Sequence, residues 1–287
     1  MWTDESMSDK RRPQGAKGPR RSVLFVPGSS AKMLEKARGL ACDVVVLDLE
    51  DSVAPEAKDD ARAAICAAVR NYPGREVVVR INALATVWGQ ADLGAVQHAK
   101  PDAILLPKVD RAADIAAAKG NIPLWAMIET PLSVLNVADI AAGGVECLAM
   151  GSNDLLKAMH GHPLPDRRNL WAAMSQTVMA ARAHGLSVLD GTHNEIGDIK
   201  GFDEACAQAR AFGFDGKTLI HPLQVGPCNR AFSPSLDEIV QARRILQAFA
   251  DNPGKGAIAF DGRMIERLHA EEARRLLALA QAVEGQA

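Results

Sequence analysis

Two short stretches decide the fold: I-P-L-W-A-M-I-E-T-P-L at residues 122–132 and V-E-C-L-A-M-G-S-N-D-L-L at residues 145–156. Each contains an apolar run that leads to a carboxylate, Glu129 in the first and Asp154 in the second. Apolar runs of this length bounded by Pro or Gly are typical of buried parallel strands. The residues between them, roughly 132–142, have helical spacing. We therefore expect a strand–helix–strand unit that brings both carboxylates to the carboxyl edge of one sheet.

Two carboxylates at one sheet edge suit a magnesium ion. Mg²⁺ prefers oxygen ligands and typically takes one or two carboxylates from a protein, keeping its other positions for water and substrate. The spacing also allows a purely structural interpretation, in which Glu129 is an acid at a helix N-terminus and Asp154 caps the next helix. The rest of the chain favours the metal site.

The alternation of apolar runs and helical stretches continues on both sides of this unit. Together with the two runs above, it predicts eight strands, and most of them end in polar residues. The other six runs are 22–26, 43–48, 76–82, 103–106, 186–190 and 216–220. This pattern predicts an α/β fold of the (β/α)₈ TIM-barrel type, whose active sites gather at the carboxyl ends of the strands. A doubly wound sheet would be expected to carry G-x-G-x-x-G after an early strand, and the sequence has none.

Three segments are predicted along the chain. Residues 1–20 are rich in Lys, Arg, Gly and Pro without periodicity, which predicts a disordered basic leader. The barrel is expected over residues 21–232. Residues 233–287 exceed what a barrel needs and form a C-terminal extension, with helices expected at about 236–250 and 264–283. We expect this extension to pack on a neighbouring subunit, with the Gly-rich stretch between its helices bending across the interface.

Composition limits the class of protein. The length of 287 residues suits a single barrel, and 48% hydrophobic residues provide a large core. A formal charge of −2 and an aromatic content of 4% give no indication of nucleic-acid binding or of attraction to an anionic membrane. The five cysteines are scattered and include no C-x-x-C pair, which favours reduced thiols. No run reaches transmembrane length, so we expect a soluble, cytoplasmic protein.

Charged residues follow the second and third predicted strands. Asp48, Glu50 and Asp51 lie at and just past the end of the second run, and the third run ends in Arg80 and Asn82. A guanidinium at a strand end can clamp a carboxylate with two hydrogen bonds. It can also neutralise the three acids, and the two roles are compatible. In the helix expected between these strands, Lys58 is predicted to lie on the solvated face.

A turn after the first strand could bind phosphate. Residues 27–30 read P-G-S-S and open a helix that carries Lys32 in its first turn. Free backbone N–H groups at such a turn can hold a phosphate. The signal is weak by itself because many helices begin in this way.

The order of these motifs resembles the citrate lyase β-subunit-like family, which is part of the larger aldolase/citrate lyase superfamily. The motifs are R-S-V-L-F-V-P-G, V-L-D-L-E-D-S-V, V-V-R-I-N, L-P-K, M-I-E-T-P, N-D-L and G-F-D-G-K-T-L-I-H-P-L-Q, and the resemblance covers about residues 20–285. It implies a Mg²⁺-dependent carbon–carbon lyase that acts on a 3-hydroxyacyl thioester. Malyl-CoA, citramalyl-CoA and citryl thioesters are the substrates of that family. It also implies a homo-oligomer, a trimer or a dimer of trimers.

The resemblance assigns roles to individual residues. Glu129 and Asp154 would hold the Mg²⁺, and Arg80 would grip the carboxylate of the 2-oxo-acid fragment. Phe25 and Lys32 would contact the CoA moiety. Asp48 and Glu50 would support Arg80 and the metal-bound waters.

One assignment departs from the pattern of the family. In related lyases the catalytic acid/base is an Asp in a motif like G-x-M-I-D, donated by a neighbouring subunit. Here the matching stretch reads D-G-R-M-I-E, which places Glu266 there, with Asp261 as a possible substitute. Glu reaches about one methylene further, and reaction geometry is sensitive to displacements on the order of 1 Å. Glu266 can serve as the base, or the activity can be altered. Asn153 also stands where relatives often carry an acid.

Three other functions remain open at this point. The chain could be a citrate lyase β subunit that cleaves a citryl group carried on a partner protein. It could be a non-catalytic relative that retains metal and CoA binding, which the change at Glu266 would favour. It could also be an aldolase that acts on free 2-oxo acids, in which case it would have no affinity for CoA thioesters.

Overall fold

The computed structural model describes residues 18–285 of the chain. Its internal contacts divide the chain into two compact units, one ending at Ala231 and the other beginning at Phe232. Most of the predicted leader, residues 1–17, lies outside the described residues. The last residue of that segment, Arg20, is buried, and its guanidinium makes hydrogen bonds of 2.5 and 2.7 Å to the Glu76 carboxylate. Ordered structure therefore includes Arg20.

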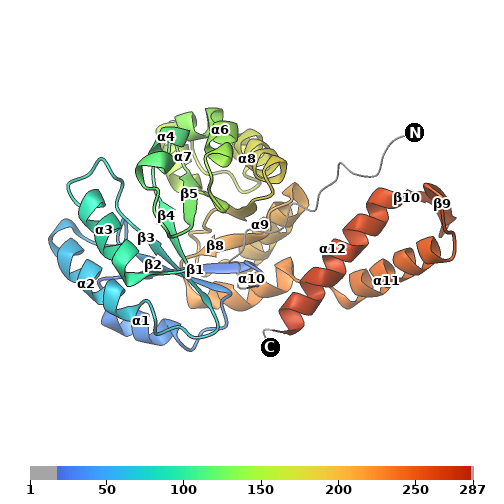
Figure 1. Cartoon of the computed structure of the whole chain (residues 1–287), viewed down its shortest axis with the longest axis horizontal. Coiled ribbons are helices and arrows are strands. Elements are labelled where there is room, and N and C mark those ends of the chain that lie inside the picture. The colour runs from blue at the N-terminus through green and yellow to red at the C-terminus, as the bar shows by residue number, and fades with distance from the viewer. Residues whose placement is uncertain (1–17, 286–287) are drawn as a thin grey trace. The chain divides into compact units, whose positions relative to one another are not determined.

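The first unit is a closed barrel of eight parallel strands that neighbour one another in chain order, as predicted (Figure 1). The strands are β1 Ser22–Pro27, β2 Val44–Asp48, β3 Glu76–Arg80, β4 Ala103–Leu106, β5 Leu124–Ile128, β6 Cys147–Met150, β7 Ser187–Asp190 and β8 Gly216–Leu219. Closure is made by β8, which pairs with β1. Because all strands run in the same direction, their carboxyl ends meet at one rim of the barrel.

Helices follow the strands around the outside of the barrel. They are α1 Ala31–Ala37, α2 Lys58–Ala68, α3 Gly89–Ala99, α4 Ala112–Ala117, α5 Pro131–Leu135, α6 Val137–Ala142, α7 Ser152–Ala158, α8 Trp171–Ala183, α9 Ile199–Phe212 and α10 Val225–Phe232. Short 3₁₀ turns lie at Pro55–Ala57, Arg168–Leu170 and Pro222–Gln224. The helix expected at 132–142 is two short helices, α5 and α6, that meet at Asn136.

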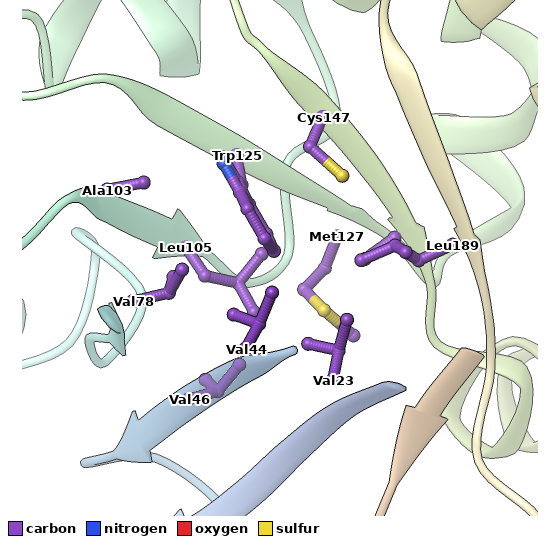
Figure 2. Packing of buried hydrophobic residues seen from close by; sticks show 11 residues of the cluster. Val23, Val44, Val46, Val78, Ala103, Leu105, Trp125, Met127, Cys147 and Leu189 are labelled. Atoms are coloured by element: carbon purple, nitrogen blue, oxygen red, sulfur yellow. The ribbon is translucent and has the colours of Figure 1, made fainter. Parts of the chain in front are cut away.

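Apolar side chains fill the interior of the barrel (Figure 2). Alternate residues of each strand point inward, so that β-branched and large side chains from neighbouring strands interlock. Trp125 of β5 lies among them with no exposed surface. The interior cluster consists of Val23, Val44, Val46, Val78, Ala103, Leu105, Trp125, Met127, Cys147, Ala149 and Leu189. This packed core leaves the ends of the barrel as the places where polar chemistry can occur.

The second unit is a helical hairpin with a small sheet. Helices α11 Leu236–Ala250 and α12 Arg267–Glu284 pack along each other, and the antiparallel strands β9 Ala257–Phe260 and β10 Arg263–Glu266 connect them (Figure 1). The expectation that the second helix begins at 264 was wrong, because Met264 lies in β10. Asp261 and Gly262 both have positive φ, at 48° and 74°. An Asp-Gly pair of this kind makes the two-residue turn that a β-hairpin requires.

Two further expectations concern the whole chain. None of the helices within residues 18–285 is long and apolar enough to cross a membrane. The five cysteines are free thiols, and four of them are buried.

Candidate active site

The carboxyl rim of the barrel brings Arg80 together with the acids that follow β2. Register pairs Arg80, the last residue of β3, with Asp48, the last residue of β2. The guanidinium donates two hydrogen bonds to the Asp48 carboxylate, at 2.6 and 2.7 Å, and Nη1 lies 2.7 Å from Oε2 of Glu50. Nη1 is also 3.5 Å from Oδ2 of Asp51. Arg80 therefore neutralises the acidic cluster, which was one of its two predicted roles.

Ring stacking completes the support of Arg80. The guanidinium lies 4.6 Å from the centre of the Phe25 ring, which packs against the apolar interior of the barrel. A cation over an aromatic face is held by the quadrupole of the ring. With Asp48 on one side and Phe25 on another, Arg80 is fixed in one orientation, and its side chain is 9% exposed.

The pKa values of Asp48 and Glu50, both beside Arg80, are shifted in opposite directions. Burial tends to raise the pKa of Asp48, but the charge and hydrogen bonds of Arg80 outweigh it and hold this pKa below its ordinary value. For Glu50 burial dominates: despite Arg80, it raises the pKa to about 8, and the nearby Glu129 carboxylate adds to the rise. The site thus combines a fixed carboxylate with a carboxyl group that can hold a proton near neutral pH.

Glu129 is the most enclosed acid of the rim, with a side chain that is 1% exposed. It follows β5, and its backbone N–H donates to the Ser133 hydroxyl at 3.0 Å, which fixes the turn into α5. Gly151 makes room for the carboxylate: a Cβ atom at this position would lie 2.4 Å from Oε2 of Glu129. Burial raises the pKa of Glu129, and the positive charge of Lys108 opposes the rise.

Asp154 lies in the first turn of α7, immediately after β6, and is about one third exposed. Lys108 links Asp154 to Glu129. Its ammonium contacts Oδ2 of Asp154 and lies 3.2 Å from Oε1 of Glu129. The backbone N–H of Lys108 also donates to Oε1 of Glu129 at 2.8 Å. The two predicted metal ligands therefore face the same point. In the sequence, Lys108 is notable only as the last residue of the L-P-K motif.

Behind the rim, Lys58 supports the turns that carry the acids. The prediction that it lies on a solvated face was wrong, because it is only 6% exposed. Its ammonium donates three hydrogen bonds, to the carbonyls of Leu49 and Glu50 at 2.8 and 2.7 Å and to the Asn82 side-chain oxygen at 2.7 Å. Helical periodicity did not reveal this because it indicates the face on which a residue lies but not what packs over that face. Burial lowers the pKa of Lys58, and the charges of nearby acids, with Asp48 the largest, partly offset this.

Two predicted residues, Lys32 and Glu266, remain to be described. Lys32 is exposed in the first turn of α1, which begins after Ser30, whose hydroxyl accepts from the Met33 N–H at 3.3 Å. Glu266 belongs to the second unit, where it ends β10 and is exposed, and its backbone N–H donates to Nδ1 of His269 at 3.0 Å. Their predicted roles, toward CoA and toward a neighbouring subunit, stay predictions.

The donor set of the rim fits a magnesium ion better than a softer metal. Over residues 18–285 there is no group of three or more His, Cys, Asp or Glu side chains that could hold a metal. The candidate ligands are the two carboxylates that meet at Lys108, those of Glu129 and Asp154. Mg²⁺ typically takes one or two carboxylates from a protein. A zinc site would be expected to have three or four ligands with nitrogen or sulfur among them.

Comparison with known protein families identifies the family of the chain. The model of the HpcH/HpaI aldolase/citrate lyase family matches residues 21–222, which is the barrel with its rim. The chain belongs to this family. The match includes Arg80, Glu129 and Asp154, and it ends before the second unit.

Relatives over nearly the full length include two differently named enzymes. The chain is 46% identical over 273 residues to (3S)-malyl-CoA thioesterase of Cereibacter sphaeroides, covering 92% of this chain and 96% of that protein. It is 32% identical over 282 residues to the citrate lyase subunit beta of Escherichia coli, covering 91% and 93%. Members of this one family thus differ in the reaction for which they are named.

The solved structures most like this one include CitE from Mycobacterium tuberculosis in complex with magnesium, acetoacetate and coenzyme A. It superposes with a TM-score of 0.81 at 33% sequence identity and covers 92% of this chain and 98% of that one. The citrate lyase beta subunit of the same organism was solved with oxaloacetate and magnesium, and it matches with a TM-score of 0.68 at 31% identity, covering 77% of this chain. The fold is therefore one that binds magnesium and small acids in related proteins.

Proposed function

We propose that this chain is a Mg²⁺-dependent carbon–carbon lyase that cleaves a 3-hydroxyacyl-CoA thioester into acetyl-CoA and a 2-oxo acid. Malyl-CoA, citramalyl-CoA and citryl-CoA are the candidate substrates. The observation that carries this proposal is the convergence of Glu129 and Asp154 on one point of the barrel rim, where Arg80 is also fixed. A related CitE structure contains magnesium and coenzyme A, which supports both the cofactor and the substrate class.

Each residue of the rim has a distinct role in this proposal. Glu129 and Asp154 would hold the Mg²⁺, which when bound polarises the oxygens of the substrate and stabilises the negative charge that develops on them. Arg80 would bind the substrate carboxylate, because its fork of N–H groups matches a carboxylate and Asp48 holds it in place. A protonated Glu50 would favour this binding, since a neutral neighbour does not compete with an incoming anion for Arg80.

Cleavage also needs a group that moves protons. The substrate hydroxyl loses its proton, the bond between the hydroxyl-bearing carbon and the neighbouring methylene breaks, and the electron pair of that bond forms a thioester enolate. Protonation of the enolate carbon then gives acetyl-CoA. We assign this acid/base role to Glu266, donated by the second unit of a neighbouring subunit in a homo-oligomer. Its position at the end of a short, regular hairpin favours a fixed placement of the carboxylate.

Hydrolysis of the thioester is the second candidate function. The observation that favours it is the 46% identity, over nearly the whole chain, to proteins named (3S)-malyl-CoA thioesterase. In that reaction water would attack the thioester carbonyl, and the products would be a free hydroxy acid and free CoA. A Glu in place of the usual acid/base Asp could favour the activation of water, because its carboxylate reaches further.

Two other functions can be distinguished by which thioesters the protein turns over. A citrate lyase β subunit, which the 32% identical relatives are, would require the citryl group on a carrier protein and would show no turnover of the CoA ester. A non-catalytic relative would bind Mg²⁺ and CoA without turnover of either kind of thioester.

The deciding experiment measures both kinds of product from the same substrates. Purified protein with Mg²⁺ is given malyl-CoA, citramalyl-CoA and citryl-CoA, and the released 2-oxo acid and free thiol are assayed in parallel. A lyase releases 2-oxo acid and acetyl-CoA without free thiol, and a thioesterase releases thiol without 2-oxo acid. The Glu129→Ala variant should lose about 10²-fold or more of either activity. Full activity of that variant, or no turnover of any CoA thioester, would exclude the proposed reaction.

A further inference from the structure

Lys108 occupies the point on which the two proposed metal ligands converge. Its ammonium contacts the Asp154 carboxylate and lies 3.2 Å from Oε1 of Glu129. Both acids direct an oxygen toward this single cation, which therefore takes the place that a divalent cation would have between them. Two cations cannot share these oxygens at close range, because their mutual repulsion at a few ångströms is large in a partly buried site.

The backbone of Lys108 is anchored independently of its side chain. The N–H group donates to Oε1 of Glu129 at 2.8 Å, and the residue adopts a φ of +51°, a conformation uncommon for a residue other than glycine. This conformation directs the N–H group and the side chain toward the same carboxylate. Movement of the side chain would therefore leave the N–H bond to Glu129 intact, and Glu129 would keep its orientation.

The side chain of Lys108 has room to move, in contrast to the other cation of the rim. It is 35% exposed and ends in a flexible four-carbon chain with a single ammonium. Arg80 is 9% exposed and is held by two hydrogen bonds to Asp48 and by the Phe25 ring. Of these two cations, Lys108 is the one that a metal ion can displace.

We propose that Lys108 is an internal counter-ion for Glu129 and Asp154, which Mg²⁺ displaces when it binds. The inference rests on the proposed metal site but not on the reaction that the site performs. The ammonium would stabilise two neighbouring carboxylates when no metal is bound, and it would set the Mg²⁺ affinity by competing for the same oxygens. The chemistry that Lys108 recognises is thus a pair of carboxylates, and its competitor is a divalent cation.

Titration of the full-length protein with Mg²⁺ in a calorimeter tests the competition directly. The Lys108→Met variant keeps the backbone N–H and most of the length of the side chain but removes the charge. We expect it to bind Mg²⁺ with a Kd roughly three- to tenfold lower than the unchanged protein, as expected for the loss of a competing ion pair. The matched control is Lys157→Met, which removes an exposed charge from α7, the helix that carries Asp154. Its Kd should change by less than about twofold.

Thermal unfolding with and without Mg²⁺ separates a displaced counter-ion from a merely structural lysine. Without Mg²⁺, Lys108→Met should unfold at a lower temperature than the unchanged protein, because Glu129 and Asp154 repel each other without a cation. At saturating Mg²⁺ the difference should disappear or change sign, since the metal replaces the missing charge. A deficit that persists at saturating Mg²⁺, or a Kd that stays the same or rises, would overturn the proposal. These readouts do not depend on turnover, so they remain valid if the proposed lyase activity is not found.

Discussion

Individual carboxyl groups at the rim determine how this protein should respond to pH. Burial raises the pKa of Glu50 to about 8, whereas an unfolded chain ionises glutamate near 4.5. Between these values the folded protein keeps a proton that the unfolded chain has lost, so the free energy of unfolding falls as the pH rises through this window. Glu50→Gln removes this titration, so the free energy of unfolding of the variant should fall less steeply between pH 5 and 8 than that of the unchanged protein. The two slopes should differ by up to about 1.4 kcal/mol per pH unit. Urea unfolding at several pH values measures the slope, and parallel slopes for the two proteins would contradict the assignment.

Gly151 shows how one missing side chain shapes the site. A Cβ atom there would lie 2.4 Å from Oε2 of Glu129 and 3.1 Å from the Met127 methyl group, so Gly151→Ala must push the carboxylate away from its position. We expect weaker Mg²⁺ binding and a loss of activity of about 10²-fold, because a displacement on the order of 1 Å is enough for such a loss. Gly197→Ala is the control, since a Cβ atom at that position has no neighbour within 4 Å. Mg²⁺ titration and turnover of the unchanged protein and the two variants would show the contrast, and equal values for both alanine variants would exclude the steric explanation.

At the scale of elements, helix α2 stabilises the rim through one buried ammonium. Lys58→Met would leave the carbonyls of Leu49 and Glu50 and the side-chain oxygen of Asn82 without this donor. Loss of a buried donor typically costs about 1–3 kcal/mol of stability, and the turn that carries Glu50 should also loosen. Chemical denaturation measures the loss, with the exposed Lys36→Met variant as the control for removal of a lysine. If the two variants are equally stable, Lys58 does not have this supporting role.

The same elements show what the sequence could predict. Apolar runs with clear boundaries predicted all eight strands, and the polar residues at their ends predicted the rim, because parallel strands must bring their carboxyl ends together. Lys58 was missed because helical spacing gives the face of a residue but not what packs over that face. The β9–β10 hairpin was missed although Asp261 and Gly262 carry a recognisable turn signal. The bridging position of Lys108 depends on a positive φ, which a lysine in the sequence does not indicate.

At the scale of the whole molecule, the proposed reaction requires two units from different subunits. Arg80 belongs to the barrel and Glu266 to the C-terminal unit. Arg80→Ala and Glu266→Ala should each be nearly inactive in the proposed cleavage. When the two variants are unfolded, mixed in equal amounts and refolded together, an active site can combine the intact barrel of one chain with the intact Glu266 of another. About one quarter of the sites in such a mixed oligomer have both intact groups, so roughly one quarter of the original activity should return.

If each Glu266 serves the barrel of its own chain, the mixture must stay inactive, because no chain carries both groups. Refolded unchanged protein gives the reference activity, and the size of the oligomer in solution confirms that the chains have assembled.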